Sequence, residues 1–198
     1  MTRTAKAILV AALLLVAASC GSEATESATS SAAASGRAGF LSERFADAAF
    51  QGNTKAVEEM LELVDVDAVD EGGRTMLMLA SYGGHSTTVR LLCENQANPN
   101  LKDVNRRTAL MYAASGPNSH TVEILLAHGA EVNVTDGDEG YTALMFAAAE
   151  GHADIVQMLL DQGADPNLRD IDGESALKFA TDQNHQGVIA VLQKAAKD

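Results

Sequence analysis

The stretch GYTALMFAAAEGHADIVQMLLDQGADPN, residues 140–167, decides the fold. It holds two short apolar segments, 143–149 and 155–160, separated by the pair Gly151-His152. Thr142 precedes the first segment, where its hydroxyl can cap a helix, and Gly163 follows the second, where a left-handed residue can end one. The stretch therefore predicts two short helices, each with its own start and stop signals, joined by a tight turn.

The same pattern recurs along most of the chain. The hydroxyl residue that begins each copy is Thr75, Thr108, Thr142 or Ser175, at offsets of 33, 34 and 33 residues, and a degenerate earlier copy runs from about residue 41 to 69. The copy with offset 34 carries its extra residue within Asp136–Glu139. We expect five repeats, at about 37–69, 70–102, 103–135, 136–169 and 170–198. No repeat can bury its own apolar face, so the stack should fold as a unit.

The recurring Thr-x-Leu, Gly-His and Gly-Ala-Asp-Pro-Asn elements resemble the ankyrin-repeat family over about 160 of the 198 residues. The resemblance implies an all-α fold, a solenoid of about five helix-turn-helix repeats with hairpin loops, over residues 40–198. The family's Pro-Leu-His is Met-Leu-Met at 76–78 and ends in Met or Lys in the other copies, which predicts weaker cross-links between hairpins. Pro117-Asn118 replaces Gly-His in the third repeat, so a different turn is expected there.

The resemblance also implies a role in binding other proteins, on a concave face formed by hairpin tips and the first helices. Carried over position by position, this candidate face comprises Glu71, Arg74, Tyr82, Asn105, Arg107, Tyr112, Ser115, Asp138, Glu139, Tyr141, Phe146, Glu150, Asp172, Glu174 and Asp182. All three tyrosines of the protein are included, and tyrosine is enriched at binding hot spots. For Tyr112 and Phe146 the alternative is a partly buried core position.

Chemical sites are not indicated. His85, His152 and His185 occupy one repeat position, but neighbouring repeats stack about 8–10 Å apart, whereas zinc ligands lie within about 2.3 Å of the ion. The resemblance implies that these histidines are structural residues at the turn between helices. The segments 136–140 and 170–173 resemble the start of a calcium-binding loop, but an EF-hand needs a glutamate in its twelfth position. Counted from Asp136 and Asp170, that position holds Ala147 and Thr181, so we expect both segments to be hairpin tips. We therefore expect neither a metal, nor a cofactor, nor an enzyme.

The N-terminus has the pattern of a bacterial export signal. Two positive charges lie in Met1–Lys6, a twelve-residue apolar run follows at 7–18, and Ser19-Cys20 comes next. Twelve helical residues span about 18 Å, which is short of a hydrocarbon core of about 30 Å, so a permanent membrane helix is the weaker reading. The stretch 17–20 resembles a lipobox, which implies a signal peptide at 1–19 and a lipid on Cys20. The alternative is an ordinary signal peptide.

The segment 20–39 predicts a lipidated cysteine followed by a disordered linker, because it is rich in Ser, Thr, Ala and Gly. Gly21 rather than aspartate after Cys20 resembles lipoproteins sorted to the outer membrane, if the cell is Gram-negative. With Cys20 lipidated, the second cysteine, Cys93, has no partner, and its apolar surroundings at 89–93 predict a buried structural thiol.

Composition limits the partner. The chain is 46% hydrophobic and carries a net charge of −13, which disfavours nucleic acid and anionic lipid and suits a basic or neutral protein. The prediction is a monomeric, lipid-anchored scaffold on the periplasmic side of the envelope or on the cell surface. It would serve a periplasmic enzyme as an accessory or neutralise a toxin as an immunity protein. The alternatives are a purely structural envelope protein, or an enzyme that uses Asp138, Glu139, Glu150 and Asp172.

Overall fold

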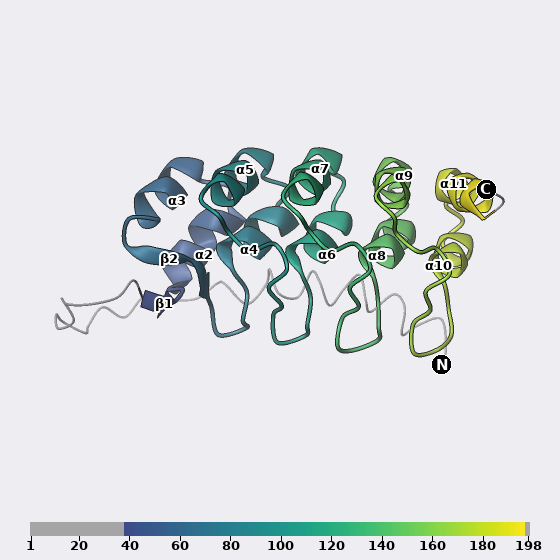
Figure 1. Cartoon of the computed structure of the whole chain (residues 1–198), viewed down its shortest axis with the longest axis horizontal. Helices are drawn as coiled ribbons and strands as arrows, with labels where there is room; N and C mark the ends of the chain where they lie inside the picture. The colour runs from purple at the N-terminus through teal and green to yellow at the C-terminus, as the bar shows by residue number, and fades with distance from the viewer. Residues whose placement is uncertain (1–37, 197–198) are drawn as a thin grey trace. The chain divides into compact units, whose positions relative to one another are not determined.

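The computed structural model describes residues 38–196, which form five helix-turn-helix pairs stacked side by side (Figure 1). The first helices of the pairs are α2 (Glu43–Phe50), α4 (Met76–Tyr82), α6 (Ala109–Ala114), α8 (Ala143–Glu150) and α10 (Ala176–Asp182). The second helices are α3 (Thr54–Met60), α5 (Ser86–Glu94), α7 (Ser119–Ala127), α9 (Ala153–Asp161) and α11 (Gln186–Ala195). The two sets form separate rows, and the hairpins project beyond the row of first helices (Figure 1). The predicted all-α solenoid is confirmed.

The predicted signal peptide and Cys20 lie outside the described residues, as does nearly all of the predicted linker. No helix within 38–196 is long and apolar enough to cross a membrane.

One element was not predicted. Strand β1 (Ala38–Phe40) pairs in parallel with β2 (Val64–Val69), with Ala38 opposite Val64 and Phe40 opposite Val69. Valine alternates with aspartate along 64–67, and Ala68-Val69 follow, which suits a half-buried strand. No helix pair precedes α2 in the described part of the chain, and the segment leading into α2 pairs with β2 instead. The fold is therefore helical except for this small sheet, which begins slightly before the predicted domain start at residue 40.

The hydroxyl residues predicted as caps all stand at the N-cap of a first helix, but they do not all act alike. Thr75 and Thr142 accept hydrogen bonds from the backbone N–H groups of Met78 and Met145, at 3.3 Å each. Thr108 and Ser175 make no such bond. Their contribution is the extended backbone that begins the helix, with ψ of 166° and 169°. The predicted N-cap position is thus confirmed for all four residues, and the predicted side-chain hydrogen bond forms at two of them, Thr75 and Thr142.

The turns between and after helices use left-handed residues where the sequence predicted them. Gly84 and Gly151 follow first helices with φ of 69° and 83°, and Gly129 and Gly163 follow second helices with φ of 82° and 85°. An L-residue with a side chain is unfavourable in this region, whereas glycine adopts it readily.

The third repeat departs from this arrangement, as Pro117-Asn118 predicted. Asn118 caps α7 by accepting a hydrogen bond from the N–H of Thr121, and its side-chain amide donates to the carbonyl oxygen of Gly84 in the preceding repeat. The asparagine therefore stands where repeats two, four and five have histidine, and it makes a different bond between repeats.

Close packing of first helices explains the recurring alanine. Ala80, Ala113, Ala147 and Ala180 are all buried, and each first helix packs against its neighbours in the row. Met78 and Met111, which stand where the family has histidine, are buried in the core. The hairpins are nevertheless joined by backbone hydrogen bonds, such as the one from Gly137 N to Asn105 O at 2.8 Å. That the cross-links between hairpins are weaker than in the family stays a prediction.

Asparagines join neighbouring repeats at the base of the hairpins. The Asn100 side chain donates to Gly129 O at 2.9 Å and accepts from Glu131 N at 2.8 Å. Asn133 makes the same two contacts one repeat later, with Gly163 O at 3.0 Å and Asp165 N at 2.9 Å. One side chain thus satisfies a helix-end carbonyl and a loop N–H in the next repeat, which fixes the two repeats relative to each other.

Two histidines of the periodic set have the structural role that was predicted. His85 donates from Nε2 to the carbonyl oxygen of Phe50 at 2.8 Å, and His185 donates to Ala149 at 3.0 Å. Both carbonyls lie at the C-terminal end of the preceding repeat's first helix, where helical carbonyls lack internal partners. The His85 ring also lies over Gly52, where an added Cβ would come within 2.3 Å of it. Among the described residues, no three His, Cys, Asp or Glu side chains are grouped to hold a metal ion.

Cys93 is buried and unpaired, as predicted. Burial raises the pKa of its thiol to about 11, with a smaller contribution from Glu94 and an opposing one from Arg90. The thiol therefore stays protonated at neutral pH and packs as a small apolar side chain.

We predict that His85→Ala lowers the free energy of unfolding by about 1–3 kcal/mol, because it leaves the Phe50 carbonyl without its partner. His152→Ala is the matched control, since His152 holds the same repeat position but makes no side-chain hydrogen bond within the described structure. Urea denaturation followed by circular dichroism measures both. Equal losses in the two variants would contradict the role given to this bond.

Candidate protein-binding face

Each hairpin turns around one aspartate, and we call Asp70, Asp103, Asp136 and Asp170 the hairpin aspartates of hairpins two to five. In every case Oδ1 accepts two backbone N–H groups of the same hairpin, at 2.7–3.2 Å. The last three of these side chains are buried. A carboxylate that accepts two N–H groups closes the turn as an Asx-type contact and removes both donors from water.

The same contacts locate the extra residue of the fourth repeat. Three hairpin aspartates bond the N–H groups two and four positions ahead, whereas Asp136 bonds Glu139 and Tyr141, three and five positions ahead. The insertion therefore enlarges the tip of hairpin four, as predicted for Asp136–Glu139.

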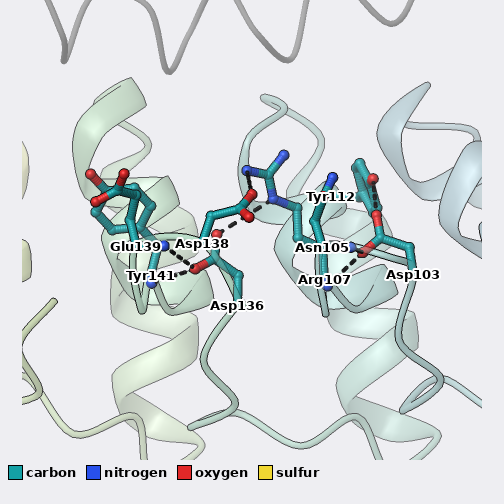
Figure 2. Close-up of polar contacts among 8 residues, drawn as sticks. All are labelled: Asp103, Asn105, Arg107, Tyr112, Asp136, Asp138, Glu139 and Tyr141. Atoms are coloured by element: carbon teal, nitrogen blue, oxygen red, sulfur yellow. Dashed lines mark hydrogen bonds and ion pairs between the residues drawn. The ribbon is translucent and has the colours of Figure 1, made fainter. Parts of the chain in front are cut away.

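Oδ2 of three hairpin aspartates holds residues of the candidate face. Asp70 pairs with Arg74 at 2.8 Å, and Asp103 accepts a hydrogen bond from the Tyr112 hydroxyl at 2.6 Å. Asp136 pairs with Arg107 at 3.5 Å, across two hairpins (Figure 2). Sequence reasoning placed Asp136 and Asp170 in hairpin tips but missed the role that the four aspartates share, which their recurrence at 33 or 34 residues could have revealed.

Arg107 is a largely enclosed charge on the face. Its guanidinium lies 3.6 Å from Asp138, as well as near Asp136, and 5.7 Å from the centre of the Phe146 ring. Only 11% of its side chain is exposed. Figure 2 shows the guanidinium directed from hairpin three towards the carboxylates of hairpin four. Arg107 therefore links two hairpins, and most of its hydrogen-bonding capacity is directed inward.

Aromatic rings pack along the first helices. Tyr82 stacks on Phe50 with centroids 5.9 Å apart and meets Tyr112 edge-on at 6.0 Å. Tyr141 meets Phe146 at 5.9 Å and Phe179 at 5.3 Å, both edge-on. Such pairs stabilise a surface by about 0.5–1.5 kcal/mol each beyond the area that they bury.

Of the four aromatic residues predicted to contact a partner, two are buried and two are half-buried. Tyr141 and Phe146 are 6% and 5% exposed, so both belong mainly to the core. This corrects the expectation for Tyr141, whose ring turns inward because Phe146 and Phe179 pack against it. Tyr82 and Tyr112 are half-buried and retain area for a partner.

The phenols sit in acidic surroundings. Burial raises the pKa of Tyr141 to about 12, and the charges of Asp170 and Glu139 add to that effect. The pKa of Tyr112 rises through burial and through its hydrogen bond to Asp103, and that of Tyr82 through burial and the charge of Glu150. All three hydroxyls are therefore neutral at physiological pH and can act as hydrogen-bond donors.

The exposed part of the face consists of acidic side chains and two aliphatic ones. Glu71, Asp138, Asp172 and Asp182 are exposed, and Asp182 pairs with Lys178. The half-buried members are Arg74, Tyr82, Asn105, Arg107, Tyr112, Ser115, Glu139, Glu150 and Glu174. Val104 and Ile171, each 70% exposed, were missed by the sequence analysis. Both directly follow a hairpin aspartate, and an aliphatic residue at that tip position is the signal that could have found them.

We predict that Asp136→Ala lowers the free energy of unfolding by about 2–4 kcal/mol, because the N–H groups of Glu139 and Tyr141 lose their acceptor and Arg107 loses its buried partner. Asp138→Ala is the control, since this carboxylate is half exposed and its pairing with Arg107 is long. It should cost under about 1 kcal/mol. Urea denaturation of both variants tests this prediction. A loss of stability for Asp136→Ala as small as that of the control would contradict the role of Asp136 in closing hairpin four and holding Arg107.

Comparison with known protein families matches Ankyrin repeats (3 copies) at residues 45–136 and 121–198, most of the chain. No curated protein matches. Ankyrin repeats generally mediate protein–protein interaction, and proteins of this kind are typically non-catalytic scaffolds. The helix pairs, the hairpins and this match agree, and the chain belongs to the ankyrin-repeat family.

Proposed function

We propose that this chain is an exported, lipid-anchored scaffold that docks a basic protein in the bacterial envelope. The observation that carries the docking proposal is the composition of the exposed face, which presents carboxylates together with two exposed aliphatic side chains at hairpin tips. Apolar contacts enclosed by polar ones are the usual anatomy of a protein interface.

The charge of the face supports a basic partner. Arg74 and Arg107 are already paired with hairpin aspartates, so their charge is neutralised locally. The exposed carboxylates of Glu71 and Asp172 remain, together with Asp138, whose ion pair with Arg107 is long at 3.6 Å, in a protein whose net charge is −13. A negative surface of this kind attracts positively charged partners and speeds their association.

The proposed location rests on the N-terminal sequence. A signal peptide at 1–19, a lipid on Cys20 and a linker to residue 39 would hold the repeats near a membrane without embedding them. Gly21 favours the outer membrane in a Gram-negative cell. Two roles fit this place, an accessory to a periplasmic enzyme and an immunity protein against a toxin. A basic partner is expected in both, and a monomer suffices for either.

We predict that the double variant Asp138→Lys/Asp172→Lys binds the partner at least about tenfold more weakly, which corresponds to about 1.4 kcal/mol. The matched control is Glu58→Lys/Glu59→Lys, which makes the same charge change at exposed positions of α3, a second helix. The measurement is capture from membrane fractions by tagged protein, followed by titration with the captured partner. Equal losses in both variants would contradict a specific face, and no capture at all would favour a structural envelope protein.

We predict that the mature protein begins at Cys20 and carries a lipid there, which mass spectrometry of the N-terminal peptide detects directly. Cys20→Ser should move the protein from the membrane fraction to the soluble fraction while leaving partner affinity unchanged. An unmodified terminus at or beyond Cys20 would refute the anchor and leave the docking proposal intact.

A further inference from the structure

We propose that an open pocket between hairpins three and four binds a small ligand through an oxyanion group, a phosphate or a carboxylate. The pocket measures about 590 Å³ and is lined by the following residues: Lys102, Arg106, Glu131, Val132, Asn133, Val134, Thr135, Gln162 and Gly163. None of these residues belongs to the candidate protein-binding face, so this site is independent of the proposed docking function.

Two cations give the pocket its character. Lys102 and Arg106 are exposed, and neither forms an ion pair within the described part of the chain. Arg74, Arg107 and Lys178 each meet a carboxylate, whereas Arg44 and Lys55 are also exposed without an ion pair to another described residue. What distinguishes Lys102 and Arg106 is that both line one pocket. The pocket lining holds one carboxylate, that of Glu131, so its local charge is positive in a strongly acidic protein. Charge-assisted bonds from an ammonium and a planar guanidinium suit phosphate and carboxylate oxygens.

Uncharged donors complete the lining, on a rigid floor. The Thr135 hydroxyl and the Gln162 carboxamide line the pocket and make no hydrogen bond with other described residues. Asn133, which also lines the pocket, bonds Gly163 O and Asp165 N and so fixes repeat three against the residues that follow α9 in repeat four. Donors held by a fixed backbone lose less conformational freedom on binding.

The backbone at Arg106 is unfavourable for an arginine. Its φ is 60°, and the matching positions of hairpins two, four and five are Gly73, Gly140 and Gly173, with φ of 72–80°. Gln96 and Asn184 also have positive φ, so backbone strain alone marks no site. At Arg106, however, the neighbouring hairpin leaves space for the side chain, because Gly137 has no Cβ. A Cβ added at Gly137 would lie only 2.9 Å from Arg106 Cδ. The chain thus retains an arginine where glycine fits better, beside a second unpaired cation.

The ligand must be small. At physiological ionic strength charges are screened over about 8 Å, so contacts within the pocket outweigh the distant negative charges for a compact anion. An extended polyanion such as nucleic acid would also meet the acidic remainder of the surface and be repelled. A small phosphate or carboxylate compound meets the two cations without that penalty.

The test is an NMR titration of the full-length ¹⁵N-labelled protein in non-ionic detergent, with inorganic phosphate or succinate added at constant ionic strength. We expect saturable shifts of the Arg106, Thr135 and Gly163 amides, and at least tenfold weaker binding by Lys102→Gln/Arg106→Gln. The control Arg44→Gln/Lys55→Gln removes two exposed cations from repeat one and should bind like the wild type. Saturation by phosphate alone or by succinate alone identifies which oxyanion the site takes. Shifts that never saturate, or that persist in the pocket variant, would overturn the proposal.

Arg106→Gly separates binding from a structural role. Glycine relieves the positive φ, so this variant should withstand urea at least as well as the wild type while binding the anion at least tenfold more weakly. An Arg106→Gly variant that binds the anion like the wild type would overturn the proposal, whatever its stability.

Discussion

The contact between one aspartate carboxylate and two backbone N–H groups recurs in every hairpin from the second to the fifth. It closes the turn, and its second oxygen is then placed to hold Arg74, Tyr112 or Arg107. The candidate face inherits its geometry from this contact, because hairpin tips have few other side chains to order them. Each repeat of a solenoid packs only against the adjacent repeats, so every hairpin needs such local contacts of its own.

The two candidate sites differ in how their cations are used. On the docking face, arginines are matched with hairpin aspartates, so what remains exposed is negative and suits a basic protein. In the pocket between hairpins three and four, Lys102 and Arg106 are unmatched, so a small anion meets positive charge. An overall charge of −13 therefore describes neither site by itself. Local pairing decides which charge a ligand meets, because screening limits distant charges more than contacts.

Much of the fold could be read from local chemistry. Hydroxyl residues at helix starts, glycines with positive φ at helix ends and the extra residue in hairpin four all appear where the repeat pattern placed them. These features depend on a few neighbouring residues, so a sequence states them directly. The pairing of β1 with β2 was missed because it joins segments that no repeat pattern relates.

The sequence by itself determined the number of repeats, their turns and the set of positions from which a binding face is built. Only the tertiary structure decided which of those positions face outward. Tyr141 is buried between Phe146 and Phe179, whereas Val104 and Ile171 lie exposed at hairpin tips. Alignment gave Tyr141 the repeat position of the half-buried Arg74 and Arg107, so it could not show that the ring is buried. Exposure at the surface of a repeat depends on the side chains that the adjoining repeats place against it.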